Sequence, residues 1–206
     1  AGIMTARAVA GPLVRVAGPD DRDVVVATVV AAFRNDPAFQ YFFPDPKRYD
    51  HEAAVFAAYL FDKRVGKQLV WVAENCEAVA MWDNPSSAAD WENEGDDPLY
   101  LEAVERMGSA AERIEIYDGP VEAFLPSTPY WYLGILACHP DHAGQGLAPR
   151  VSREGLDSAS ATGIDSYLET TNPSNLGIYE RAGWEIVHEA NHIPDVPIWV
   201  LRHRPQ

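Results

Sequence analysis

The sequence predicts an α/β domain whose central sheet is at least partly parallel. Three observations support this class: the chain is long enough for a core, its second half alternates strands with helices, and its first part supplies a strand, helices and a hairpin. In the second half, strands are expected at 129–138, 165–171, 184–190 and 197–203, with helices at 146–161 and 173–183. Strand–helix–strand order is typical of parallel strands joined by a crossover helix.

The first 83 residues are expected to begin with a short strand at 13–17. Asp20 or Asp21 can cap the following helix, which covers VVVATVVAAFRND. A second helix is expected over 46–64, and the apolar runs 68–74 and 77–83 predict a hairpin.

The domain organisation is expected to be simple. With 206 residues and 22.7 kDa, the chain fits one domain over 1–206. Residues 1–10 are interpreted as a tag remnant with a disordered start, because Met4 follows Ala-Gly-Ile. The segment 84–128 is expected to be a loop-rich insertion with one helix near 99–113, either over a ligand site or as a surface excursion.

Composition excludes several classes of protein. Thirty-one acidic and sixteen basic residues give a net charge of −15, which argues against a nucleic-acid partner but can attract small amines. A membrane protein is not predicted, because no apolar run reaches about 18 residues. Cys76 and Cys138 form no CxxC pair, so we expect neither a disulfide framework nor a metal site, and a cytoplasmic location.

The segment HPDHAGQGLAPR (139–150) joins the end of a strand to the start of a helix. A helix start offers free backbone N–H groups and a partial positive charge, so it binds anions. Gly144 and Gly146 would let a phosphate approach these amides. The spacing matches neither GxGxxG nor a P-loop, which argues against nucleotide hydrolysis. Taken alone, the segment could equally be a tight turn.

A second segment, ETTNPSNLGIYERAGW (169–184), makes the chain resemble the GNAT superfamily of N-acetyltransferases. LACHP (136–140) and AGQGLA (143–148) match that family's strand and phosphate-loop signatures. Its other hallmark is matched by Asn172, Tyr179, Gly183 and Trp184. Two residues depart from the family pattern. Ala143 stands where the family has Gln or Arg, and Cys138 stands where it has Val. Because the loop binds through main-chain N–H groups, these departures should weaken affinity and keep the site.

Four further segments resemble the puromycin N-acetyltransferase-like branch of the family. They are FRNDPAFQYFFPDPKR (33–48), VAMWDNP (79–85), PDHAGQGLA (140–148) and LETTNPSNLGIYERAGW (168–184).

The resemblance implies a GNAT fold, with a mixed sheet of about six to seven strands flanked by helices. It also implies acetyl-CoA as co-substrate, without a metal. The Cys138 N–H would polarise the thioester carbonyl, and Asn172 or Asn175 would contact CoA or fix the loop. The residues implied in cofactor binding are Leu136, Ala137, Cys138, Ala143, Gly144, Gln145, Gly146, Leu147, Ala148, Pro149, Asn172 and Asn175.

Two residues are candidates for proton transfer. Tyr179 matches the family's general acid, since a tyrosine stays protonated at neutral pH and can protonate a leaving thiolate. Glu169 is the first candidate for the base, although an exposed or salt-bridged glutamate on a strand is an equal alternative. The resemblance implies an acceptor pocket formed by segments that face the acyl end in this family, with the candidates Phe33, Asn35, Asp36, Phe39 and Trp82. A carboxylate with aromatic rings suits an amine on an apolar body.

The resemblance, with these residues, implies transfer of an acetyl group from acetyl-CoA to a primary amine of a small molecule by direct attack. Two alternatives stay open: a protein or peptide N-acetyltransferase, and a non-catalytic acyl-CoA-binding module. The expected partner is a small-molecule amine, and the expected assembly is a monomer or homodimer. The acceptor itself is not readable from the sequence.

Overall fold

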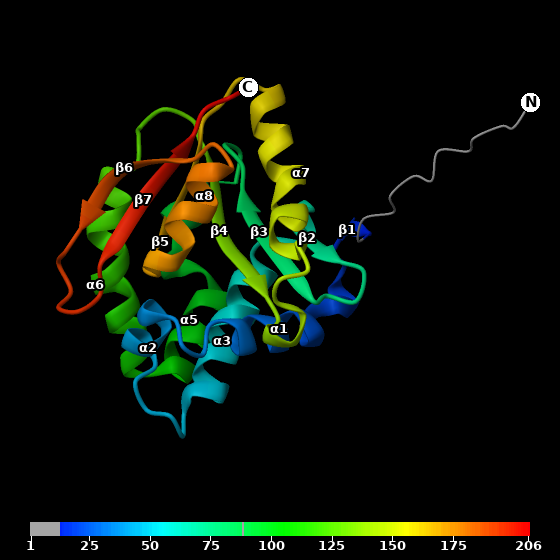
Figure 1. The fold of residues 1–206 in the computed structure, drawn as a ribbon. Coiled ribbons are helices and arrows are strands. Elements are labelled where there is room, and N and C mark those ends of the chain that lie inside the picture. Colours follow the sequence, from blue (N-terminus) through cyan, green and yellow to red (C-terminus); the bar gives the residue numbers. More distant parts are fainter. Residues whose placement is uncertain (1–12, 88) are drawn as a thin grey trace, which may run out of the picture.

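A computed structural model describes residues 13–87 and 89–206 (Figure 1). The expected tag remnant at 1–10 lies outside these residues. The described chain forms one seven-stranded sheet in the order β1-β2-β3-β4-β5-β7-β6. The strands are β1 (Val14–Val16), β2 (Val70–Ala73), β3 (Ala78–Asp83), β4 (Trp131–Cys138), β5 (Ser166–Thr170), β6 (Glu185–Ala190) and β7 (Ile198–His203). The prediction of a mixed sheet of six to seven strands is confirmed.

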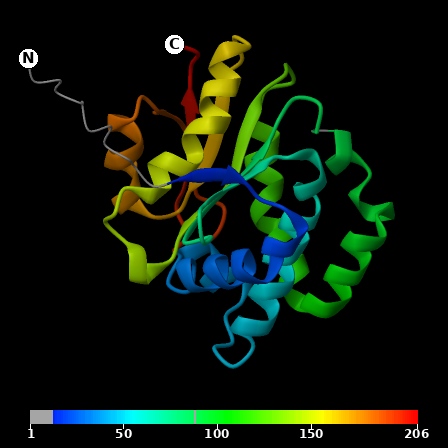
Figure 2. The ribbon, with the colours of Figure 1, turned by 90° about the vertical axis from the view of Figure 1, so that its right-hand side faces the viewer.

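The helices cover both faces of the sheet, so that the protein has three layers (Figure 2). On one face lie α7 (Leu147–Ala161) and α8 (Leu176–Arg181). On the other face lie α1 (Arg22–Ala32), α2 (Pro37–Phe42), α3 (Tyr49–Asp62), α5 (Pro98–Met107) and α6 (Ser109–Phe124). The layers enclose two hydrophobic clusters, one on each side of the sheet.

The path of β4 determines where the site lies. Beside β3 the strand is paired along its length, with an irregularity that leaves Gly134 as an extra residue between Leu133 and Ile135. Beside β5 it is paired in parallel at Trp131↔Ser166 and Tyr132↔Tyr167, and the described register goes no further. The bulge bends β4, so its carboxyl half separates from β5 and leaves a gap in the sheet.

The bulge accommodates a buried ion pair. Arg64 donates to Asp83 through Nε and Nη2, at 3.0 and 2.8 Å, and to the Leu60 carbonyl oxygen at 3.1 Å. A Cβ at Gly134 would stand 2.8 Å from Arg64 Nη2. Glycine is therefore the residue that lets the guanidinium pack against β4.

The segment 84–128 is mostly helical, which corrects the expectation of a loop-rich insertion with one helix at 99–113. It contains α4 (Ala89–Glu92), α5 and α6. Gly108, with φ +58°, separates α5 from α6. The dipeptide Gly119-Pro120 suggests a helix end, but Pro120 lies inside α6, which continues to Phe124. Helix α2 was also missed, although Asp36 and Pro37 supply its cap and first position.

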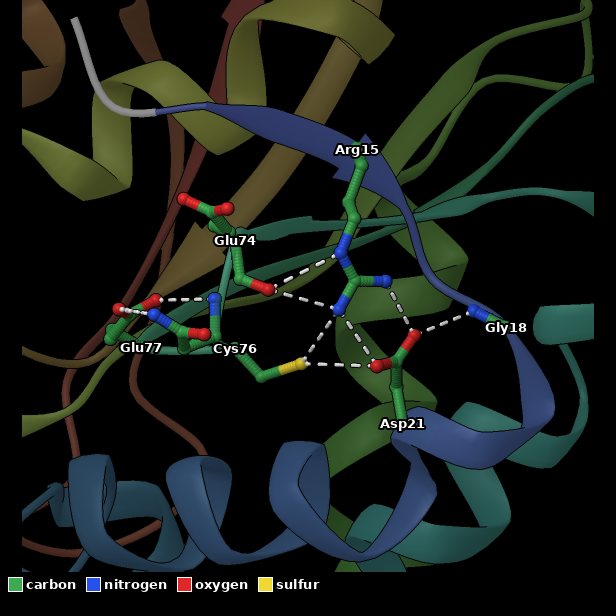
Figure 3. A network of polar contacts seen from close by, with 7 residues as sticks. Arg15, Gly18, Asp21, Glu74, Cys76 and Glu77 are labelled. Carbon is green, nitrogen blue, oxygen red and sulfur yellow. Dashed lines mark hydrogen bonds and ion pairs between the residues drawn. The ribbon is translucent and has the colours of Figure 1, made fainter.

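A polar network ties the edge strand β1 to the rest of the protein (Figure 3). The Asp21 carboxylate does not cap α1. It accepts hydrogen bonds from Arg15, at 2.7 and 2.8 Å, and from the Gly18 N–H at 2.8 Å. Arg15 also donates to the Glu74 carbonyl oxygen at 3.0 Å, and Cys76 Sγ lies 3.6 Å from Asp21 Oδ1. The hydrogen bonds from Arg15 lower the pKa of Asp21 to about 2.

We predict that Asp21→Asn lowers the free energy of unfolding by about 1 to 2 kcal/mol near neutral pH, since the bonds to Arg15 weaken while part of the pair is exposed to solvent. The folded pKa lies below the unfolded value of about 4, so this contribution is complete above about pH 5 and is lost as the pH falls toward 2. Urea denaturation of both proteins across this range measures it.

Asp20→Asn is the control, because Asp20 is an exposed neighbour of the same charge. Equal losses of stability in the two variants would show that the Arg15 network contributes nothing specific.

Candidate active site

The gap beside β4 exposes backbone amides on its open edge. The His139 N–H donates to the Glu77 carbonyl oxygen at 2.8 Å, on the β3 side of the strand. Successive amides of a strand point to opposite edges, so the N–H groups of Cys138 and Leu136 point away from β3 and into the gap. These are donors for an extended ligand lying along β4.

The glycine-rich loop lies at the end of β4 and at the start of α7. Gly144 and Gly146 have φ values of +79° and +72°, which residues with a Cβ rarely adopt. Nothing lies within 4 Å of a Cβ built on either glycine, so the backbone conformation explains them better than crowding does. The loop is exposed from Ala143 to Gly146, and the first amides of a 15-residue helix follow. This arrangement suits a phosphate group.

The opposite side of the gap carries Glu169 on β5 and Tyr179 on α8. Burial raises the pKa of Glu169 to about 8, with additional repulsion from Glu122 and Asp36, and its Oε2 atom has no hydrogen-bond partner among the described residues. Burial also raises the pKa of Tyr179 to about 12, and the nearby Glu169 adds to the shift. One group is therefore poised to exchange a proton near neutral pH, and the other holds its proton throughout.

The gap opens into a cavity of about 800 Å³ on the α1–α6 side of the sheet. Its walls come from β4, β5, α3, α5 and α6. Glu169, Tyr179 and Leu136 line it together with many aromatic rings and acidic side chains. Such a cavity has the size of a small-molecule site and a charge that favours cations.

The structure brings together most of the predicted acceptor residues. Phe33, Asp36 and Phe39 line the cavity, the two phenylalanines stacked with ring centroids 4.4 Å apart. Asp36 caps α2 by accepting from the Phe39 N–H at 3.1 Å, and burial raises its pKa. Asn35 is exposed and does not line the cavity.

Trp82 is not brought to the cavity either. It is 0% exposed and packs beneath α7, where a Cβ at Gly155 would come within 2.4 Å of its ring. All six residues of β3 are buried, so hydrophobic alternation could not tell which face Trp82 occupies.

The remaining candidates surround the gap. Asn175 lines the cavity and lies 3.4 Å from Thr170 Oγ1, while Asn172 accepts from the Ser174 N–H at 3.1 Å as a cap. Cys138 Sγ lies 3.6 Å from the carbonyl oxygens of its neighbours, His139 and His142. Ala137 and Leu147 are buried in the two hydrophobic clusters, so each can contribute backbone contacts alone.

Sequence reasoning missed the acidic residues of α6. Glu115, Asp118 and Glu122 all line the cavity, as does Glu94 from the preceding turn. Their spacing of three, four and seven residues places the α6 carboxylates on one helical face, a signal that was present in the sequence. It was overlooked because this stretch was expected to be irregular beyond residue 113.

The site combines a gap between two parallel strands with an exposed helix start at one end and a cavity that contains Glu169 and Tyr179 at the other, an arrangement suited to group transfer from an elongated donor. The model of the acetyltransferase (GNAT) family matches residues 38–184, and the chain belongs to this family. The protein is therefore an acetyl-CoA-dependent N-acetyltransferase. The residues present fit acetyl-CoA, because β4 offers free amides for the pantetheine arm and the loop offers amides for the pyrophosphate.

Solved structures share the fold over nearly the whole chain. Histone acetyltransferase HPA2 and related acetyltransferase from Corynebacterium glutamicum is 25% identical, with a TM-score of 0.69, covering 95% of this chain and 97% of that one. Mosquito arylalkylamine N-acetyltransferase like 5b is 14% identical, with a TM-score of 0.56 and coverages of 93% and 99%. The Drosophila melanogaster polyamine N-acetyltransferase is 12% identical, with a TM-score of 0.57 and the same coverages.

The described residues have two further properties, which concern their helices and their possible metal ligands. None of their helices combines the length and the apolar character that crossing a membrane requires. Nor do three or more of their His, Cys, Asp and Glu side chains gather as a candidate metal site.

We predict that acetyl-CoA at 100 times its dissociation constant stabilises the protein by about 2.7 kcal/mol, and that Gly146→Glu abolishes this shift. A glutamate there places a charged side chain against the phosphates and strains the loop. Thermal denaturation with and without acetyl-CoA measures the effect.

Gly163→Glu is the matched control, because Gly163 has φ +70° and lies just beyond the opposite end of α7. This variant should keep the shift. If acetyl-CoA stabilises a folded Gly146→Glu variant as much as it stabilises the parent, this loop is not the phosphate-binding site.

Proposed function

We propose that the protein transfers the acetyl group of acetyl-CoA to a primary amine of a small molecule, with direct attack of the amine on the thioester. The observation that carries the proposal is the cavity of about 800 Å³, which meets the gap beside β4 at Glu169 and Tyr179. Its acidic and aromatic lining suits an amine on an apolar body.

In this proposal the cofactor's role is to supply an acetyl group activated as a thioester. The amides of Gly144 to Ala148 hold the pyrophosphate, and the Cys138 N–H donates to the thioester carbonyl oxygen. Phe33, Asp36 and Phe39 position the acceptor. Gln145, Asn172 and Asn175 contact the nucleotide end or support the loop.

Glu169 and Tyr179 move the protons. An ionised Glu169 accepts a proton from the acceptor's ammonium group, directly or through water, which frees the nitrogen lone pair. As the N–C bond forms and the C–S bond breaks, the Tyr179 hydroxyl would donate its proton to the thiolate sulfur. The nitrogen that now carries the acetyl group would lose its extra proton to the tyrosinate, directly or through water, which restores Tyr179 and leaves a neutral amide. A tyrosine with a pKa of about 12 is reliably protonated, although its high pKa makes it a weaker acid than an ordinary tyrosine.

Two narrower points belong to the same proposal. Segments 33–48, 79–85, 140–148 and 168–184 support placing the chain in the puromycin N-acetyltransferase-like branch. The Corynebacterium structure, described as a histone acetyltransferase and related acetyltransferase, favours a peptide amine as the alternative acceptor. An amine panel that includes a peptide N-terminus and a lysine side chain, assayed for free thiol, separates these acceptors.

We predict that Tyr179→Phe lowers single-turnover acetyl transfer by about 10²-fold, the usual scale for a positioned general acid. The ring and its edge-on contact with Trp184 remain, so the shift in melting temperature with acetyl-CoA should persist. Rapid-quench measurement with a confirmed acceptor tests this.

Tyr41→Phe serves as the control, since Tyr41 carries a hydroxyl that does not line the cavity. An unchanged rate of acetyl transfer in Tyr179→Phe would show that Tyr179 is a packing residue and that water acts as the general acid.

A second prediction concerns the pH profile. Burial holds the pKa of Glu169 at about 8 in the protein without substrate, and a base acts only when ionised, so kcat/KM of the parent should rise as the pH rises through about 8. Glu169→Gln should lower kcat by about 10²-fold and remove this limb of the profile.

Glu189→Gln, an exposed substitution on β6, should leave both rate and profile unchanged. If the limb persists in Glu169→Gln, another group is the base.

A further inference from the structure

The acidic lining of the cavity extends well beyond the proposed base. Helix α6 turns Glu115, Asp118 and Glu122 toward the cavity, on the same face as the apolar Ile114 and Val121. In an ordinary amphipathic helix the inward face is apolar. This wall lies on the opposite face of the sheet from α8, which carries Tyr179 (Figures 1 and 2).

The negative charge of the cavity is not balanced within the protein. Of the described residues that line it, eight are acidic and one, Arg64, is basic. Arg64 is already engaged by Asp83 in a two-point ion pair. Glu94 accepts a hydrogen bond from the Tyr59 hydroxyl, which leaves its charge uncompensated.

Asp118 is the centre of this excess charge. Among the described residues its carboxylate takes part in no hydrogen bond or ion pair. Burial, together with repulsion from Glu169, Glu122 and Glu94, raises its pKa well above the ordinary value. Glu169 independently lines the same cavity, and its Oε2 atom is buried without a hydrogen-bond partner among the described residues. Desolvated carboxylates without partners destabilise a protein, and they are characteristic of places where a charged ligand completes the site.

We infer that the acceptor is a dication: an amine with a second cationic group, of which an α,ω-diamine is the simplest case. Its reacting nitrogen lies at Glu169 and Tyr179, and its second ammonium group binds Asp118 and Glu122 on α6. The apolar linker between the two cations packs on aromatic rings of the cavity wall, among them Phe42, Tyr59 and Tyr100. This inference rests on the proposed function for the identity of the reacting nitrogen.

The kinetic test compares amines that differ only in the second charge. Putrescine and cadaverine are compared with n-butylamine and n-pentylamine in the presence of acetyl-CoA. A charge-assisted hydrogen bond to Asp118 should make kcat/KM at least about 10-fold higher for each diamine than for the monoamine of equal length. Equal values would overturn the inference while leaving the acetyltransferase activity in place.

Asp118→Asn tests the residue. The substitution keeps the shape of the side chain and removes an unpartnered carboxylate, so the variant should fold at least as stably as the parent. It should lower kcat/KM for the diamines by about 10-fold and change that for the monoamines by less than about twofold. Glu112→Gln, a charge change on an exposed residue of the same helix, should change neither. Two results would contradict binding of the second cation at Asp118. One is an equal effect of Asp118→Asn on diamines and monoamines, and the other is a loss of diamine preference in Glu112→Gln.

A binding measurement separates this inference from the proposed function. Without acetyl-CoA, isothermal titration should show tighter binding of putrescine than of n-butylamine to the parent and no such difference in Asp118→Asn. Preferential diamine binding without acetylation of any amine would support the dication site and refute the proposed function. Acetylation of amines without a diamine preference in either measurement would support the proposed function and refute the dication site.

Discussion

The separation of β4 from β5 after Tyr132 is the constraint on which the site depends. Parallel strands are normally held together by a continuous ladder of hydrogen bonds, and here the described ladder stops after two register positions. The bulge at Gly134, packed against the buried Arg64–Asp83 pair, turns β4 away at this point. The same departure leaves unpaired amides for a donor on one side and admits Glu169 and Tyr179 on the other.

A site of this kind opposes the stability of the fold. Glu169 has a buried Oε2 atom without a hydrogen-bond partner among the described residues, and Asp118 is a half-buried carboxylate that also lacks one. Partial or full loss of water around each group destabilises the folded state when the group is ionised. The hydrophobic clusters on the two faces of the sheet offset this, since β2 and β3 are almost entirely buried between helices. The continuously paired strands β1 to β4 thus support the gap beside β4, which Glu169 and Tyr179 line.

Much of the fold was readable from sequence because its signals are local. Strand and helix periodicity predicted the second half of the chain, and the glycines at 144 and 146 marked a helix start with unusual backbone angles. The predictions that failed concerned helices whose formation depends on tertiary contacts. Helix α2 is only six residues long, and α6 passes through Gly119-Pro120, which reads as a break. Packing against the sheet and neighbouring helices outweighs the local cost of the proline.

The candidate site was predicted to a similar extent. Glu169, Tyr179, Phe33, Asp36 and Phe39 do meet in one cavity. Trp82 does not, because a strand buried on both faces carries no alternation to show which way a side chain points. The acidic wall of α6 was missed for a different reason. The stretch beyond residue 113 was expected to be irregular, and only the tertiary position of the helix shows that the face shared by Glu115, Asp118 and Glu122 is turned toward the cavity.

The acceptor wall and the donor site are encoded in separate stretches of the chain. Helices α5 and α6 belong to the single segment between β3 and β4, whereas the glycine-rich loop, Glu169 and Tyr179 follow β4. The part of the cavity wall that α5 and α6 supply could therefore drift in evolution, or be exchanged in the laboratory, as one continuous segment, while the residues from α1 to α3 that line the cavity stay in place. The machinery that activates the acetyl group would be inherited unchanged, which is how one catalytic framework can serve many different amines.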